Sequence, residues 1–443
     1  MPSAASRLHI ISTGTTMATV TAKPEVSDVG HYWPGEGVHR VPYKVYLDPE
    51  IYALEQERIF RGPTWNYVAL EAEISKPGDF KTTSIGDTPV VVTRDREGAV
   101  HAMVNQCAHR GAKVCREPYG NSMKLQCIYH QWNYDLKGKL VGVPFRNGIP
   151  GDNGRVGGMP ADFSLGDHGL TKLKVETVNG VVFASFDHDL PPFRQYIGET
   201  MWYYFDRVFD GRPLRVMGQL RQKIGGNWKL MFENIKDPYH ASLLHVFLVS
   251  FGLFRADQKS KVEMDEGGGH SVLVSRKGEQ KASGSTADMA SFKSDYTLHD
   301  PSLLDRRKEF KDENTVVMQT IFPSLIVQQQ TNTLAMRQIL PLGPNAFELV
   351  WDFFGYADDD EEMRKIRLKQ ANLMGPSGLV SIDDSEAIEM CHRGIAGNPD
   401  ASAVVELGGR ECNNEEHMVT ETAIRAFYKH YRDIMGFDTG DRN

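Results

Sequence analysis

The feature of this sequence that most constrains the fold is a pair of short arms, each with one cysteine and one histidine. The first arm is Cys107-Ala108-His109 and the second is Cys127-Ile128-Tyr129-His130, with 17 residues between them. Two thiolates and two imidazoles are sufficient to hold a metal centre. The chain must therefore bring two loops together around one point.

Two kinds of centre are compatible with these four residues. One is a structural zinc ribbon, which uses the same ligand types. The other is a 2Fe-2S cluster in which two histidines replace two cysteines on one iron, the Rieske arrangement. In zinc sites, the two ligands of one arm are usually of the same type. Here each arm has one cysteine and one histidine, as two loops that clamp a two-iron unit must have. The spacing therefore favours the iron-sulfur cluster.

Length, charge and apolar patterning exclude several classes of protein. A chain of 443 residues allows two or three domains, and 50 Lys and Arg against 58 Asp and Glu, without a basic run, argue against nucleic-acid binding. The most apolar run, residues 243–254, is interrupted by His245 and Ser250 and is too short for a membrane helix. Five widely spaced cysteines cannot form a disulfide framework, which favours the cytoplasm.

The pattern along the chain predicts an α+β protein. A small all-β domain is expected to be inserted in a larger domain whose antiparallel sheet is covered by helices. The expected parts are a loose leader at 1–30, an N-terminal helical part at 31–66, the β domain at 67–187 and the larger domain at 188–443. Expected helices span about 48–60, 192–208, 228–249, 359–374 and 419–435; expected strands fall within 316–341 and 347–354. Residues 265–295 are expected to be a loop or lid.

A second group of metal-binding residue types lies in the segment Asn227–His245. His240 and His245 are five residues apart, and a straight helix would leave them roughly 140° apart. Asp237-Pro238 is a predicted break that could bring them together. Two histidines and one carboxylate form the ligand set of non-haem iron(II) oxygenases. The carboxylate could come from the Asp383-Asp384 pair, although such a pair is also typical of a solvated helix start.

Taken together, these motifs resemble the large subunit of Rieske-type aromatic-ring-hydroxylating oxygenases over residues 30–437. The respiratory branch of the Rieske family has an extra cysteine in each loop, whereas here Cys115 lies beyond the first loop and the second loop offers no partner. The resemblance implies that Cys107, His109, Cys127 and His130 hold the 2Fe-2S cluster. It also implies mononuclear iron on His240, His245 and Asp384, with Asn234 and Asp237 at the catalytic centre.

The segment Asn227–His245 and the run Asn372–Gly378 further resemble the branch acting on aromatic carboxylic acids, such as salicylate, anthranilate and terephthalate. This resemblance implies a terminal oxygenase that uses dioxygen and NADH-derived electrons delivered by a reductase or ferredoxin. It also implies a homotrimer of large subunits with a small beta subunit, in an α3β3 assembly. In that ring, His130 of one chain would meet Asp237 of the next.

Arg337 is the candidate for binding the substrate carboxylate, because a guanidinium pairs bidentately with a carboxylate. An edge-strand surface arginine is the alternative interpretation. The acidic and apolar segment Glu415–Thr420 offers no second cation near the C-terminal helix, which favours a monocarboxylate over a terephthalate-type dicarboxylate. A hypothesis from another class is a non-catalytic electron-transfer or zinc-binding scaffold that uses only the two arms.

Overall fold

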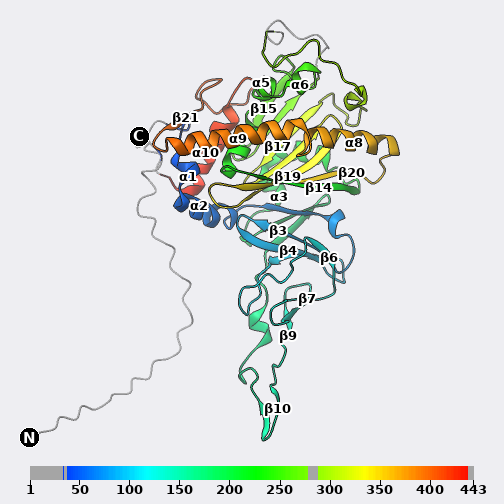
Figure 1. Cartoon of the computed structure of the whole chain (residues 1–443), viewed down its shortest axis with the longest axis vertical. Coiled ribbons are helices and arrows are strands. Elements are labelled where there is room, and N and C mark those ends of the chain that lie inside the picture. Colours follow the sequence, from blue (N-terminus) through cyan, green and yellow to red (C-terminus); the bar gives the residue numbers. More distant parts are fainter. Residues whose placement is uncertain (1–32, 34–36, 278–287, 438–443) are drawn as a thin grey trace, which may run out of the picture.

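The computed structural model describes residue 33 and residues 37–277 and 288–437. The expected leader at residues 1–30 lies outside the described residues. Figure 1 shows a broad upper body and a narrower lower arm that ends at the hairpin labelled β10. The lower arm is cyan to green-cyan, so it is built from the segment predicted to be β-rich.

Short antiparallel sheets make up the lower arm and its junction with the body, as the alternating β-rich runs predict. One sheet has the order β5-β4-β3-β6, a second β7-β8-β9, a third β12-β13-β2, and β10-β11 is a hairpin. Their bounds are β2 Asn66–Leu70, β3 Asp79–Ile85, β4 Thr88–Arg94, β5 Val100–Val104, β6 Tyr119–Asn121, β7 Leu125–Gln126, β8 Asn133–Tyr134, β9 Leu140–Gly142, β10 Ile149–Gly151, β11 Gly154–Val156, β12 Lys174–Val178 and β13 Val181–Ser185.

A seven-stranded antiparallel sheet forms the centre of the upper body, with the order β14-β20-β19-β18-β17-β16-β15. Its strands are β14 Leu214–Ile224, β15 Ser260–Met264, β16 Ser271–Ser275, β17 Val316–Ile321, β18 Leu325–Gln330, β19 Thr333–Pro341 and β20 Phe347–Tyr356. Every residue of β18 and β19 is buried. Burial on both faces places these strands between two layers of the core, where a polar side chain needs a specific partner.

Helices cover this sheet (Figure 1), and no helix of the described residues is long and apolar enough to cross a membrane. Their bounds are α1 Lys44–Leu47, α2 Pro49–Glu55 with a π-helical continuation Gln56–Phe60, α3 Phe193–Val208, α4 Trp228–Lys236, α5 Ala241–Leu244, α6 Val246–Ser250, α8 Glu361–Met374, α9 Leu379–Gly397 and α10 Thr422–Met435. Near the C-terminus, β21 (Ser402–Val404) pairs with β1 (Arg40–Pro42).

Three sequence expectations need correction. The helical pattern expected at 228–249 is three helices: the predicted break at Asp237-Pro238 is present because Pro238 lacks an amide hydrogen, and a second, unexpected break lies at His245, whose φ and ψ of −88° and 85° are non-helical. The expected loop at 265–295 contains β16, which pairs with β15 and β17. The segment after Gly378 is the 19-residue helix α9. From the sequence, the Asp383-Asp384 pair indicated at most the start of a helix there.

A buried charge cluster joins the lower arm to the large sheet. Lys81 of β3 lies 2.7 Å from Glu73 and 3.1 Å from Asp352 of β20, and all three side chains are buried. The hydroxyl of Tyr67 also donates to Asp352 at 2.7 Å. Removing one partner of such a buried cluster would leave an uncompensated charge. The cluster therefore holds the two parts in a defined relative position.

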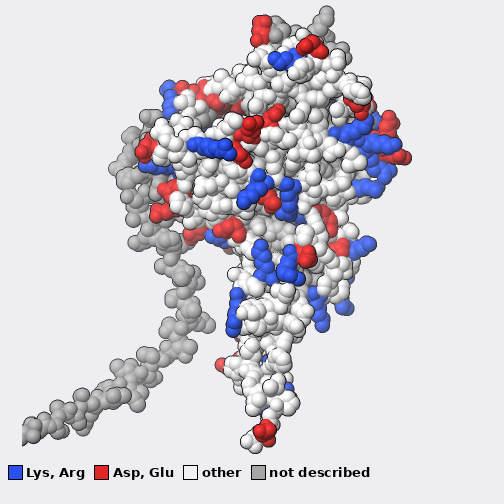
Figure 2. Space-filling model, in the orientation of Figure 1, with Lys and Arg blue, Asp and Glu red and all other residues white. Residues whose placement is uncertain are grey.

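The surface of the lower arm differs from that of the body. Figure 2 shows acidic and basic side chains interspersed on the body, whereas the end of the arm is mostly uncharged. The β10–β11 hairpin at this end exposes Ile149 and Val156. Phe145, which precedes β10 in the sequence, is 74% exposed, and the second cysteine-histidine arm exposes Ile128 and Tyr129. Exposed apolar side chains gathered at one end of a molecule are typical of a contact surface.

Candidate functional site

Each of the two cysteine-histidine arms is closed by the same type of backbone turn. The amide of Gly111 donates to the carbonyl of Cys107, and the amide of Gln131 donates to the carbonyl of Cys127, both at 2.9 Å. The residues that close these turns have positive φ, 74° at Gly111 and 53° at Gln131. Glycine adopts this conformation without strain, and a non-glycine residue adopts it only rarely. The arms therefore present their side chains in equivalent ways.

The side chains of the arms converge. Cys107 and Cys127 are buried and lie within hydrogen-bonding contact of each other, and the ring centroids of His109 and His130 are 4.5 Å apart. His130 Nδ1 is buried and has no hydrogen-bond partner among the described residues. A buried nitrogen without a partner needs an explanation, and a bound metal supplies one. The donor types and this nitrogen fit a 2Fe-2S cluster held by two thiolates and two imidazoles.

The second group of residues is assembled by two breaks in the chain. Helix α4 ends at Lys236, and Asp237 has non-helical φ and ψ of −102° and 86°, so the break predicted at Asp237-Pro238 is confirmed. A second break at His245 separates α5 from α6. As a result, the ring centroids of His240 and His245 are 5.4 Å apart.

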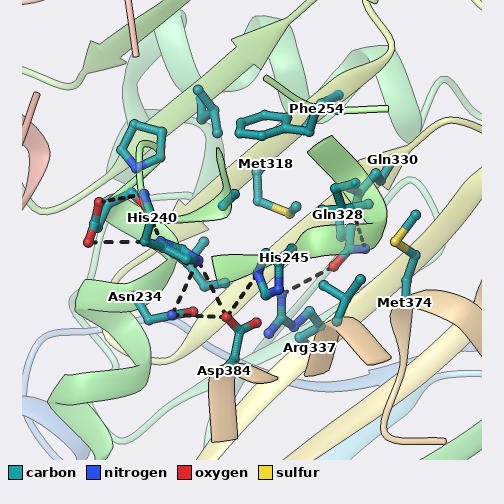
Figure 3. Close-up of a pocket in the computed structure, with 18 of the residues that line it drawn as sticks. Asn234, His240, His245, Phe254, Met318, Gln328, Gln330, Arg337, Met374 and Asp384 are labelled. Carbon is teal, nitrogen blue, oxygen red and sulfur yellow. Dashed lines mark hydrogen bonds and ion pairs between the residues drawn. The ribbon is translucent and has the colours of Figure 1, made fainter. Parts of the chain in front are cut away.

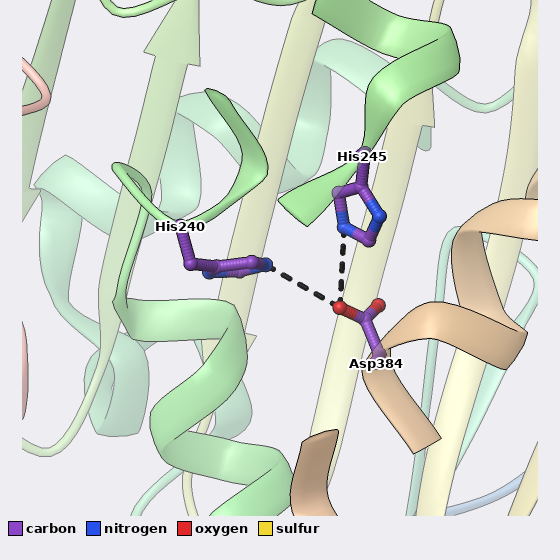
Figure 4. A group of neighbouring side chains, drawn as sticks. All are labelled: His240, His245 and Asp384. Carbon is purple, nitrogen blue, oxygen red and sulfur yellow. Dashed lines mark ion pairs between the residues drawn. The ribbon is translucent and has the colours of Figure 1, made fainter. Parts of the chain in front are cut away.

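Asp384, from the second turn of α9, completes a cluster of three (Figures 3 and 4). Its Oδ1 lies 3.4 Å from His240 Nε2 and 3.2 Å from His245 Nε2. One possible ligand atom from each residue lies within 4.8 Å of the other two. This donor set fits a mononuclear iron(II) with open coordination positions.

The charges of this cluster favour an ionised carboxylate. Burial alone would raise the pKa of Asp384, but hydrogen bonds with His240 and His245 outweigh burial and hold that pKa well below its usual range. Burial would lower the pKa of His240, whereas hydrogen bonds with Asp237 and Asp384 raise it to about 10. A metal ion at this point would replace the proton that the imidazole otherwise holds.

Asn234 and Asp237 lie beside the three. Asn234 Nδ2 donates to Asp384 Oδ1 at 3.1 Å and lies 3.5 Å from His240 Nε2. His240 Nδ1 contacts the backbone carbonyl of Asp237, and its distance to Asp237 Oδ2 is 3.8 Å. The expected catalytic residues thus lie around one imidazole, with Asp237 on the Nδ1 side and Asn234 on the Nε2 side.

A pocket opens at this cluster (Figure 3). Most of its lining is apolar, with a few polar side chains. The lining residues outside the cluster include Leu248, Phe254, Leu273, Val316, Met318, Gln328, Gln330, Arg337, Trp351, Met374 and Val380.

Arg337 of β19 is only 3% exposed and lines this pocket, so it is not a surface residue of an edge strand. Its guanidinium lies 4.1 Å from the ring centroid of Trp351 and donates to Gln328 Oε1 at 3.2 Å. Within the described part of the chain, no carboxylate lies within 4.0 Å of it, and its Nε has no hydrogen-bond partner. Burial lowers the pKa of Arg337 to about 10, so the guanidinium is still charged at neutral pH.

Two further features were not expected from the sequence. Asp383, next to Asp384 on α9, has its Oδ2 3.2 Å from His245 Nδ1. Gln328 and Gln330 both line the pocket, and Gln328 Nε2 donates to Gln330 Oε1 at 3.3 Å. The alternation of glutamines at i and i+2 on a predicted strand could have indicated one shared face. The contact of Asp383 has no signal in the sequence.

Two family models match this chain. Residues 64–151 match the Rieske [2Fe-2S] domain, and residues 212–436 match the catalytic domain of the ring hydroxylating alpha subunit. The first range contains both cysteine-histidine arms, and the second contains the pocket and the three residues His240, His245 and Asp384.

Three curated relatives are similar over nearly their whole length. The large oxygenase component of salicylate 5-hydroxylase from Ralstonia sp. is 50% identical over 91% of this chain and 96% of its own length. The large subunit of anthranilate 1,2-dioxygenase from Burkholderia cepacia is 47% identical, covering 94% and 97%. The alpha 2 subunit of the terephthalate 1,2-dioxygenase terminal oxygenase from Comamonas sp. is 45% identical, covering 91% and 97%.

Among solved structures, naphthalene 1,2-dioxygenase from Rhodococcus sp. bound to indole superposes with a TM-score of 0.74. It is 24% identical in sequence, and the match covers 90% of this chain and 96% of that one. This likeness shows that the fold is shared over most of both chains.

Proposed function

The chain belongs to the family of ring-hydroxylating oxygenase alpha subunits that combine a Rieske domain with a catalytic domain, and we propose that it hydroxylates an aromatic monocarboxylic acid. The enzyme is a terminal oxygenase of this family, with a Rieske 2Fe-2S cluster and a mononuclear iron as cofactors. We assign residues 67–187 to the Rieske domain, and residues 31–66 together with 188–443 to the catalytic part.

We assign the cluster to Cys107, His109, Cys127 and His130, and the mononuclear iron to His240, His245 and Asp384. When bound, the two groups supply electron transfer and the activation of dioxygen. The unpaired Nδ1 of His130 and the close approach of Nε2 of both catalytic histidines to Asp384 support these assignments. Asn234 holds the Asp384 carboxylate in place through its 3.1 Å hydrogen bond.

One observation carries the choice of an anionic substrate: a buried guanidinium without a carboxylate partner lines an apolar pocket beside the three assigned iron ligands. Arg337 has no counter-charge within ion-pair distance among the described residues, and Trp351 and Gln328 hold its position. A buried charge is costly unless it is paired, so a substrate carboxylate would complete this site. The aromatic-acid substrates in the names of the three relatives agree with this choice.

A single anionic group suits this pocket better than two. Among the described lining residues, Arg337 is the only lysine or arginine. The remaining polar lining away from the iron ligands includes Gln328 and Gln330, which are neutral. A terephthalate-type dicarboxylate would leave its second carboxylate without a cation, at a desolvation cost. Salicylate, anthranilate and similar acids are therefore the preferred candidates.

We also propose that three large subunits form a ring in which His130 of one subunit meets Asp237 of the next. Within one chain, the β7–β9 region lies in the lower arm, and α5 and α6 lie in the upper body (Figure 1). The exposed apolar side chains of the lower arm, such as Phe145 and Ile128, would be covered in this ring. Small beta subunits would complete an α3β3 assembly. A reductase or ferredoxin that draws on cytoplasmic NADH would supply electrons.

Oxygen uptake tests the substrate proposal. The purified oxygenase, with a reductase and NADH, is assayed with benzoate, salicylate, anthranilate, phthalate and terephthalate, and products are identified by mass spectrometry. We expect coupled oxygen uptake with one or more monocarboxylates and little with the dicarboxylates. Uptake with terephthalate alone would contradict the monocarboxylate proposal. A colourless protein that contains zinc would contradict the assignment of the arms.

A further inference from the structure

Two consecutive aspartates of α9 contact the two nitrogens of one imidazole. Asp384 Oδ1 lies 3.2 Å from His245 Nε2, and Asp383 Oδ2 lies 3.2 Å from His245 Nδ1. We propose that Asp383 is a positioning residue that accepts a hydrogen bond from His245 Nδ1–H and thereby directs Nε2 toward the mononuclear iron. This inference rests on the proposed assignment of His245 and Asp384 as iron ligands.

The chemistry of imidazole gives Asp383 this role. A neutral histidine has one nitrogen that donates and one that offers a lone pair, and only the second can bind a metal. An acceptor at Nδ1 keeps the proton there and leaves Nε2 free for the metal. A carboxylate beyond the ligand also increases the basicity of the imidazole, which strengthens the metal bond.

The other catalytic histidine is oriented in a parallel way. His240 also presents Nε2 to Asp384, at 3.4 Å, while its Nδ1 contacts the backbone carbonyl of Asp237. Each imidazole is thus held at Nδ1 by a different aspartate residue and directed toward the same carboxylate at Nε2. For His245 the acceptor is a side chain, so it can be removed by substitution.

The helix that carries Asp383 is fixed in place by hydrogen bonds to the large sheet. Gln222 of β14 donates to Ser385 at 2.6 Å and accepts a hydrogen bond from Ser381 at 2.9 Å. These contacts hold the first turns of α9. Because successive residues on a helix point about 100° apart, the rigid turn directs Asp383 and Asp384 to different sides of His245.

The expected effect is moderate because Asp383 is 34% exposed, whereas His245 is buried. Removing such an orienting partner typically lowers metal affinity by ~10–100-fold. Partial access to water weakens the contact, so we expect a loss at the lower end, about tenfold. Asparagine at this position retains a side-chain oxygen that can accept from Nδ1–H, so it should restore most of the affinity.

The test measures Co²⁺ binding to protein whose mononuclear iron has been removed and whose Rieske cluster is intact. The dissociation constant and the dissociation rate are determined by competition with a chelator for the parent enzyme, Asp383→Ala, Asp383→Asn, Asp384→Ala and Glu386→Ala. Glu386 is the matched control, since it is an exposed carboxylate on the same helix. The Rieske absorption of each sample reports that the protein is folded.

We expect Asp383→Ala to bind Co²⁺ about tenfold more weakly, with Asp383→Asn and Glu386→Ala close to the parent. Equal affinity of Asp383→Ala and the parent would overturn the inference, as would an equal loss in Asp383→Asn or in Glu386→Ala. The proposed function fails in a different way: the parent would then bind no Co²⁺, or Asp384→Ala would bind it as tightly as the parent.

Discussion

The hydroxyl of Tyr134 lies 3.2 Å from Sγ of Cys107. The same oxygen accepts a hydrogen bond from the amide of Ala108 at 3.1 Å, so its own proton is available for the sulfur. Tyr134 belongs to β8, which begins three residues after His130, and it is completely buried. This contact connects a strand of the lower arm to the cysteine sulfur of the first cysteine-histidine arm.

Replacing Tyr134 with phenylalanine should lower the reduction potential of the Rieske cluster. An O–H donor stabilises negative charge on the sulfur, and reduction adds negative charge. A net hydrogen-bond contribution of ~0.5–1.5 kcal/mol corresponds to about 20–60 mV for one electron. A spectroscopic redox titration measures the shift. Tyr129→Phe is the control, because Tyr129 is exposed and its hydroxyl contacts Arg110; an equal shift in both variants would contradict the prediction.

Arg337→Ala should weaken the use of an aromatic acid mainly through binding. Deleting one partner of a buried guanidinium-carboxylate pair costs on the order of 2–5 kcal/mol, so KM should rise at least about 30-fold while kcat changes less. Steady-state oxygen uptake measures both. The neutral amide of the same acid is the control substrate, because its binding should depend much less on Arg337. Unchanged kinetics with every acid would remove Arg337 from the substrate site.

Asp384→Ala should lose the mononuclear iron and keep the Rieske cluster. The iron content should fall from about three to about two per chain, because only the mononuclear iron depends on Asp384. Iron analysis together with the Rieske absorption of the purified protein measures this. Asp383→Ala should largely keep its iron when iron is saturating, since Asp383 contacts only the Nδ1 side of His245. The reverse result would show that Asp383 is the ligand.

Asp237→Asn should retain both metal centres and abolish product formation. The amide lacks the negative charge that would hold the imidazole of His240 and, across the subunit boundary, that of His130. In a single-turnover experiment, the cluster is reduced, substrate and oxygen are added, and cluster reoxidation is followed. Glu421→Gln is the control, because Glu421 contacts Tyr239 beside the same turn. Reoxidation and product formation at the parent rate would show that Asp237 does not couple the centres.

Glu233→Gln should remove part of the pH dependence of stability. Burial raises the pKa of Glu233 from 4.5 to about 7, although Tyr428 and Tyr46 donate hydrogen bonds to it. The raised pKa stabilises the fold fully below about pH 4.5, and this stabilisation is lost as the pH rises to about 7, by up to about 3 kcal/mol. Glutamine keeps a hydrogen-bond acceptor but cannot ionise.

Melting temperatures measured between about pH 5 and 8 test this prediction. Relative to Glu233→Gln, the parent enzyme should lose stability across this range. Glu386→Gln, which changes an exposed glutamate, should follow the parent. Parallel curves for the parent and Glu233→Gln would show that this carboxyl does not retain its proton in the folded enzyme.

Features that depend on nearby residues could be predicted from the sequence. The two cysteine-histidine arms are closed by backbone hydrogen bonds within five residues, so their spacing alone indicates the four candidate ligands. The break at Asp237-Pro238 follows from the missing amide hydrogen of proline. The antiparallel β-rich segments follow from alternation and turn residues, and the structure contains them at 88–94 and 181–185.

Features that depend on distant parts of the chain could not be predicted in this way. From the sequence alone, Arg337 could lie on the surface or in the pocket, and the position of β19 inside the seven-stranded sheet is what buries it at the pocket. The helix α9 was missed because its glycine and proline start resembles a turn. Its position decides that Asp384 lies at Nε2 of His245 while Asp383 lies at Nδ1.

The donor types, the two loops that carry the cysteine-histidine arms and the class of chemistry therefore follow from the sequence, because these depend on side-chain identity and short-range spacing. The tertiary structure sets which aspartate contacts which nitrogen of His245, and it leaves Arg337 without a carboxylate at ion-pair distance among the described residues. The aspartate contacts join residues more than 100 positions apart, such as His245 and Asp383. Only the packing of α9 and β19 around one pocket, driven by burial of apolar surface, sets their distances.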